Sequence, residues 1–153
     1  MGIAASLGLR LFWGADPDIW QYVGIATLHK LGACPSLLIT GGTLRVLESS
    51  VLPLGILPDI QASSHVFAFG DGDLLIQFTD GLSDACGGTQ ALERQAELIM
   101  HDGLQRSPEA VATALMSAAM RRSGGVPQDD ITVLCTLYKK RHAKRRENAL
   151  PSD

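Results

Sequence analysis

The sequence predicts one α+β domain, and three observations lead to this class. Residues 25–79 contain short apolar or alternating runs separated by Gly, Pro and Asp, the pattern of strands joined by turns. Residues 89–125 then place apolar side chains three or four positions apart, which is typical of amphipathic helices. Residues 131–138 form one more run rich in β-branched and apolar residues. Strands, then helices, then a strand is an α+β order rather than a repeated βαβ unit.

Each expected strand is delimited by a local signal. The runs are IATLHKL (25–31), PSLLIT (35–40), TLRVLES (43–49), SHVFAF (64–69), DLLIQFT (73–79) and ITVLCTLY (131–138). The pair Gly41-Gly42 lies between the second and third runs and predicts a hairpin. The turn GDGD, 70–73, lies between the fourth and fifth runs. Pro53 and Pro58 confine residues 51–57 to a loop or a sheet edge.

Two helices are expected after residue 88. The stretch 89–103 ends on Gly103, a residue suited to a helix C-terminus. The stretch 107–125 begins with Ser107, which can cap, and Pro108, which suits the first helical position. The apolar stripes are formed by Leu92, Ala96 and Ile99 in the first helix and by Val111, Leu115 and Ala118 or Ala119 in the second.

Composition narrows the class of protein. The chain has 153 residues, is 46% hydrophobic and 19% charged, and carries a net charge of −3, so it is globular rather than disordered. Residues 1–138 hold seven Lys or Arg against fourteen Asp or Glu, which argues against a nucleic-acid partner. Three cysteines without a CxxC motif favour reduced thiols in the cytoplasm. The apolar start, residues 1–13, is too short to span a membrane.

Acidic residues stand at the ends of two expected strands. Asp80 follows the run 73–79, and Asp129-Asp130 precede the run 131–138. If these strands are antiparallel neighbours, the acids meet at one sheet edge, where close carboxylates normally need a cation. Oxygen ligands select hard ions such as Mg²⁺ or Mn²⁺, and Gly81 would let the backbone and bound water approach. The alternative is that these are ordinary turn acids, since Asp is a common turn residue.

Four motifs in order resemble the metal-dependent (PPM-type) serine/threonine phosphatases. GDLLIQFTDGLSDA, from Gly72, and DDITVLCTLY resemble that family's two closing motifs. KLGACPSLLI (30–39) and LPLGIL (52–57) resemble the segment before them. The form that begins with Lys30 and continues to Pro35-Ser36 is most similar to the stage II sporulation protein E group. The resemblance covers about residues 24–138.

The resemblance implies an αββα sandwich with two Mn²⁺ or Mg²⁺ ions between the sheets and a metal-bound water that attacks a phosphoserine. It makes Asp80 and Asp129 metal ligands, with Asp130 supporting a ligand or acting as one if the register shifts by a residue. Gly81 supports the close approach. It implies as substrate a phosphorylated anti-sigma factor antagonist protein, whose dephosphorylation releases a sigma factor.

One motif of that family is absent from the chain. The family has a further Asp-Gly pair whose Asp bridges both ions, and no free Asp-Gly pair remains here. We therefore expect the chain to be the C-terminal half of such a domain, inactive alone and completed by the missing N-terminal half. The alternative is a non-catalytic, partner-binding module built on the same half-fold. Residues 1–23 match nothing expected, 24–138 form the partial domain, and 139–153 form a basic, flexible tail.

Overall fold

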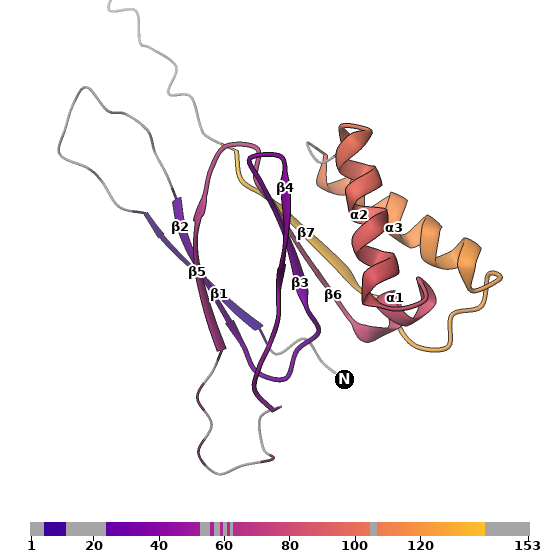
Figure 1. Cartoon of the computed structure of the whole chain (residues 1–153), viewed down its shortest axis with the longest axis horizontal. Coiled ribbons are helices and arrows are strands. Elements are labelled where there is room, and N and C mark those ends of the chain that lie inside the picture. Colours follow the sequence, from indigo (N-terminus) through magenta and orange to yellow (C-terminus); the bar gives the residue numbers. More distant parts are fainter. Residues whose placement is uncertain are drawn as a thin grey trace, which may run out of the picture.

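The protein is described by a computed structural model that covers residues 5–11, 24–52, 63–104 and 107–139, with positions 56, 59 and 61 between them. It has three layers (Figure 1): a three-stranded sheet, a four-stranded sheet and a layer of helices. The first sheet has the order β1-β2-β5, with β1 Ala5–Leu11, β2 Gly24–Lys30 and β5 Ser63–Phe69. The second has the order β4-β3-β6-β7, with β4 Thr43–Leu47, β3 Ser36–Thr40, β6 Leu74–Phe78 and β7 Val133–Leu137. The helices are α1 Asp80–Ala85, α2 Thr89–His101 and α3 Pro108–Arg122.

The predicted hairpin is confirmed. β3 and β4 are antiparallel and close on Thr40 opposite Thr43. Gly41 and Gly42 both have positive φ, of 54° and 77°, in the region that side chains with a Cβ rarely adopt. Two successive positive φ values are what a two-residue hairpin turn requires, so the Gly-Gly pair sets this register.

Two apolar clusters hold the layers together. β6 is buried at all five positions, because its two faces contact different layers. Leu75 belongs to the cluster between the sheets, while Leu74, Ile76 and Phe78 belong to the cluster under the helices. The cluster between the sheets comprises Ala26, Leu28, Leu38, Leu47, Phe67, Phe69 and Leu75. The helices contribute buried residues that include the predicted Leu92, Ala96, Ile99, Val111 and Leu115.

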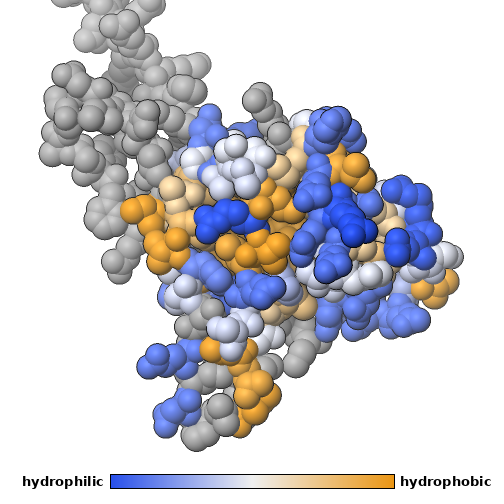
Figure 2. All heavy atoms as spheres, in the orientation of Figure 1, coloured by the Kyte–Doolittle hydropathy of each residue, from blue (hydrophilic) through white to orange (hydrophobic). Residues whose placement is uncertain are grey.

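The helical layer is polar on its outer side. Hydrophilic side chains predominate over the helices in Figure 2. α3 begins as predicted, with Ser107 Oγ accepting a hydrogen bond of 3.3 Å from the Ala110 amide and with Pro108 as its first residue. Among the helices that the structure describes, none combines the length and apolar character needed to cross a membrane.

Two elements differ from the sequence predictions. Asp80 does not end a strand in a simple turn but begins the six-residue helix α1, which buries Leu82. A helix of this length has too few turns to show a periodicity. The segment 5–11 pairs along its whole length with β2 as β1, although the sequence suggested no strand there. The predicted tail, 139–153, lies outside the described residues from position 140 onward.

Candidate metal-binding edge

The predicted pairing of the two acid-flanked strands is confirmed. β6 and β7 are antiparallel, with Phe78 opposite Val133 and Leu74 opposite Leu137. The exit of β6 and the entry of β7 therefore lie at the same edge of the four-stranded sheet. This edge is where Asp80, the first residue of α1, and the pair Asp129-Asp130 are located.

Thr79 joins the two segments that carry these acids. Its amide donates to the Thr132 carbonyl at 3.1 Å, and its hydroxyl donates to the Asp130 carbonyl at 3.0 Å. The same hydroxyl oxygen accepts from the Thr132 amide at 2.9 Å. These three hydrogen bonds extend the ladder beyond the last paired residues. They hold the segment before β7 against the start of α1.

Gly81 is required by a close contact. A Cβ at this position would lie 2.4 Å from the Asp130 carbonyl oxygen and 3.2 Å from the Asp129 carbonyl oxygen. The sequence predicted that Gly81 lets the backbone and bound water approach closely. The structure shows that the approaching group is the backbone of residues 129–130. The glycine therefore sets how closely α1 and the acidic pair pack.

The carboxylates of this edge make short-range hydrogen bonds. Asp80 Oδ1 accepts from the Gly81 amide at 3.2 Å, and its side chain is partly buried. Asp129 Oδ1 accepts from the Asp130 amide at 2.7 Å, and both Asp129 and Asp130 are exposed. In each of these two carboxylates, Oδ2 makes no hydrogen bond within the described residues and is free to coordinate a cation.

These acids do not form a complete cation cage. Within the described ranges, no group of three or more His, Cys, Asp or Glu side chains is placed to hold a metal ion. Two or three carboxylates completed by water are a poor site for Mn²⁺ or Mg²⁺. The described residues therefore fit a partial ligand set, and the ligand roles of Asp80, Asp129 and Asp130 stay predictions.

A buried lysine lies behind the loop that borders this edge. The Lys30 side chain is 1% exposed, and its ammonium group donates to the Cys34 carbonyl and, at 2.8 Å, to Ser36 Oγ. Burial lowers the pKa of Lys30 to about 8. Burial, followed by the negative charge of Asp80, raises the pKa of the Cys34 thiol, so this loop lies within electrostatic reach of the acidic edge. Lys30 belongs to one of the four sequence motifs, but the sequence alone assigned it no role.

A pocket of about 300 Å³ opens beside the acids. Gly81, Asp84 and Asp129 line it on one side, and Arg122 from the last turn of α3 lines it on another. The sequence patterns gave Arg122 no functional role. Its place here depends on the packing of α3 against α1, which no local pattern predicts.

Comparison with known proteins places the chain in a family. A family model described as "Stage II sporulation protein E (SpoIIE)" matches residues 21–139. Stage II sporulation protein E of Priestia megaterium is 24% identical over 123 residues, which is 80% of this chain and 21% of that protein. The Bacillus subtilis (strain 168) protein of the same name is 27% identical over 105 residues, or 69% of this chain and 13% of the relative. The chain thus spans about a fifth or less of these relatives.

Solved structures show the same fold. The PP2C phosphatase domain of Bacillus subtilis SpoIIE, solved with a fragment of its regulatory domain, superposes with a TM-score of 0.62 at 26% identity. That match covers 72% of this chain and 33% of the other. A second structure of this phosphatase domain, presoaked with Mn, gives a TM-score of 0.61 at 21% identity and covers 97% of this chain and 63% of the other.

Proposed function

Because the chain belongs to the stage II sporulation protein E family, with a PPM-type phosphatase fold, we propose that it supplies the C-terminal half of a metal-dependent phosphoserine phosphatase site. In this proposal the chain contributes the carboxylates of Asp80 and Asp129 as metal ligands, with Asp130 beside them. The observation that carries this proposal is the β6–β7 pairing, which brings the two predicted ligand segments to one edge and locks them through Thr79. The ions of this proposal are Mn²⁺ or Mg²⁺.

The proposal gives the residues of this chain a limited role. When two divalent ions are bound in such a site, they supply an acidic water as nucleophile and neutralise phosphoryl charge. Asp80 and Asp129 would hold the metal through their carboxylates, and Gly81 lets the backbone of residues 129–130 lie close to the start of α1. The remaining oxygen ligands have to come from the other half of the domain. A Bacillus subtilis relative was presoaked with Mn before its structure was solved, which supports manganese as the test ion.

The proposed substrate is a phosphorylated anti-sigma factor antagonist protein. This follows from membership of the stage II sporulation protein E family rather than from a contact in the chain. We expect the reaction to take place in the cytoplasm, consistent with free thiols at Cys34, Cys86 and Cys135.

A second reading is a non-catalytic module that binds a partner or the missing half. On β5, Val66 is 68% exposed and Ala68 is also exposed. These residues alternate with Phe67 and Phe69, which face the second sheet, so they lie on the opposite face. In an αββα sandwich this face is covered by helices, and the described residues place helices only on the other side. An uncovered apolar face of this kind fits a chain that docks against a further layer.

The deciding experiment compares the chain alone with a joined protein. Residues 1–153 alone should show negligible hydrolysis of a phosphoserine protein with Mn²⁺, because the described residues form only part of a cation cage. Joining an N-terminal half from a stage II sporulation protein E phosphatase domain should restore manganese-dependent turnover. Asp80→Asn or Asp129→Asn should abolish it, whereas Asp102→Asn, an exposed acid at the end of α2, should not.

Two outcomes would count against the proposal. Strong turnover by residues 1–153 alone that Asp80→Asn removes would mean that the chain holds a full ligand set, with Asp84 as the first residue to examine. A joined protein that folds, binds Mn²⁺ and still hydrolyses nothing would favour the non-catalytic module.

A further inference from the structure

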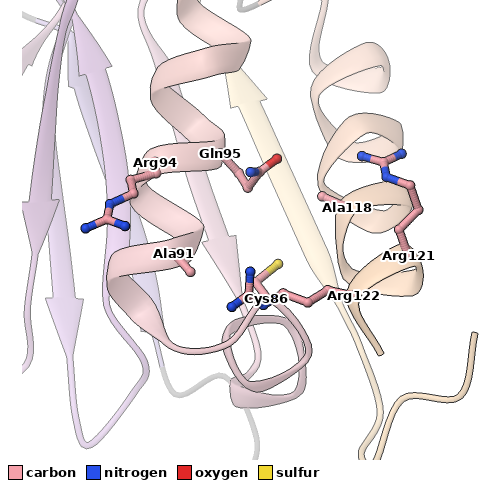
Figure 3. Close-up of a pocket in the computed structure, with 7 residues that line it drawn as sticks. All are labelled: Cys86, Ala91, Arg94, Gln95, Ala118, Arg121 and Arg122. Carbon is pink, nitrogen blue, oxygen red and sulfur yellow. The ribbon is translucent and has the colours of Figure 1, made fainter. Parts of the chain in front are cut away.

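A second pocket, of about 350 Å³, lies between α2 and α3 and contains no acidic lining residue. Its polar lining consists of three arginines and one amide: Arg94 and Gln95 from α2, and Arg121 and Arg122 from α3. Figure 3 shows Gln95 extending toward α3 and the Arg122 guanidinium lying beside Cys86, between the two helices. Arg94 extends from the side of α2 that faces away from α3, and Arg121 lies on the outer side of α3, so these two charges lie at the rim of this space.

The arginines of this pocket form no ion pair within salt-bridge distance in the described part of the chain, although Arg122 shares the neighbouring pocket with Asp84 and Asp129. In the parts of the chain that the structure describes, the one ion pair within salt-bridge distance joins His101 and Asp102. None of the three guanidinium groups has a carboxylate partner there. Residues 1–138 are acidic as a whole, with fourteen acids against seven Lys or Arg. A cluster of three unpaired arginines in such a chain is therefore an unusual concentration of positive charge.

The Arg122 guanidinium lies close over the backbone of the turn between α1 and α2. A Cβ at Gly87 would lie 2.5 Å from Arg122 Nε and 2.7 Å from one of its terminal nitrogens. Gly87 also has a φ of 88°, a conformation that side chains with a Cβ rarely adopt. The turn between α1 and α2 thus leaves a seat for the guanidinium. Burial raises the pKa of the Cys86 thiol, and the charge of Arg122 opposes that shift, which places this charge next to the buried sulfur.

The start of α2 borders the same wall and contributes partial positive charge, although the Ala91 amide itself donates to the Gly88 carbonyl at 3.1 Å. α2 begins after Gly88 without a side-chain cap and without an acidic residue in its first turn. The aligned peptide dipoles of a helix leave a partial positive charge at its N-terminus. Ala91, in this turn, lines the pocket.

We propose that the pocket between α2 and α3 binds a tetrahedral oxyanion of the phosphate class, contacted by Arg122 and Gln95 and attracted by Arg94 and Arg121. The planar guanidinium fork matches two phosphate oxygens, and the Gln95 amide can donate to a third. Pockets of this volume hold groups larger than a bare ion, so a phosphoryl group with the side chain that carries it also fits. This pocket and the pocket at the acidic edge share Arg122, but Asp84 and Asp129 line only the latter.

The test is a binding titration on the full chain, without metal. The ¹⁵N-labelled protein with EDTA would be titrated with sodium phosphate at constant ionic strength, following the Arg122 Nε–Hε signal and the Gly87 and Gly88 amides. We expect saturable shifts at these three positions. Arg122→Gln should weaken the affinity about ten-fold or more, the equivalent of one lost charge-assisted hydrogen bond. Arg122→Lys should lose less, because lysine keeps the charge without the fork.

The control is Arg45→Gln, which removes an exposed arginine on β4, in the second sheet. It should leave the phosphate affinity unchanged. A phosphoserine peptide and its unphosphorylated form would be titrated in parallel. Phosphopeptide binding that is tighter than phosphate binding identifies a phosphorylated protein as the ligand, and the reverse identifies the free ion.

Three results would overturn the inference. The first is a response to phosphate no larger than the response to chloride. The second is an unchanged phosphate affinity in a folded Arg122→Gln variant. If that variant does not fold, an unchanged phosphate affinity in Arg122→Lys has the same meaning. The third is saturable shifts confined to residues outside this pocket. None of these readouts depends on hydrolysis, so a failure here leaves the phosphatase proposal standing, and a failure of the phosphatase proposal leaves this site standing.

Discussion

Replacing Gly81 with alanine tests the close packing that joins α1 to the acidic segment before β7. The added Cβ would lie 2.4 Å from the Asp130 carbonyl oxygen, whereas ordinary van der Waals contacts begin near 3.4 Å. The contact atom is backbone, so it cannot rotate away as a side chain would. Residues 129–130 have to move by about 1 Å, as in an overpacked core site.

The expected cost is the sum of three effects. Overpacking typically costs about 1–3 kcal/mol. Displacing Asp130 weakens the 3.0 Å hydrogen bond from Thr79 Oγ1, which costs about 1 kcal/mol. Alanine favours the helical backbone of α1 over glycine by about 1 kcal/mol and offsets part of this. The net expectation is a loss of about 2 kcal/mol in the free energy of unfolding, or roughly 4–8 °C in melting temperature for a chain of this size.

Urea denaturation and thermal melting of the two proteins would measure this loss. Gly70→Ala is the matched control, because its Cβ would meet Asp73 Oδ2 at 3.5 Å, an ordinary contact. A Gly81→Ala variant that melts at or above the wild-type temperature would refute the reasoning. So would equal losses at the two glycines, since the loss would then reflect glycine replacement in general.

Three further predictions concern the stability of the chain. Because burial lowers the pKa of Lys30 from 10.5 to about 8, the unfolded chain binds more protons than the folded chain between these pH values, and stability from this site rises with pH there. The free energy of unfolding of the wild type, measured relative to Lys30→Met by urea denaturation, should therefore increase from about pH 8 to about pH 10, and a constant difference would disprove this. Leu115→Ala, at a fully buried position of α3, should lower the free energy of unfolding by about 2–5 kcal/mol in the same assay. Leu98→Ala, at a position 56% exposed on α2, should lower it far less, and similar losses would contradict the assigned core. Ser107→Ala should cost about 1 kcal/mol through loss of the α3 cap, and Ser107→Asn should largely restore it; an unchanged melting temperature for the alanine variant would show that the cap contributes nothing.

Local patterns were enough to predict most elements of the fold. Alternating and apolar runs located β2 to β7, since side-chain direction in a strand repeats every two residues. The positions of Gly41-Gly42 and of Ser107-Pro108 predicted a hairpin and a helix start, because turn and cap geometry depend on a few neighbouring residues. The acids at Asp80 and Asp129 could likewise be found from sequence, as each directly adjoins a recognisable strand.

Other features depend on contacts between distant segments, and only the tertiary structure decided them. β1 forms a strand because it pairs with β2. The short helix α1 is stabilised because it packs against α3 and buries Leu82. The close approach of Gly81 to residues 129–130 joins segments almost fifty positions apart. The burial of Lys30 and the seat of Arg122 over Gly87 are likewise set by how layers pack. The physical reason is that periodicity records which face of an element is buried, but it carries no information on which element covers that face.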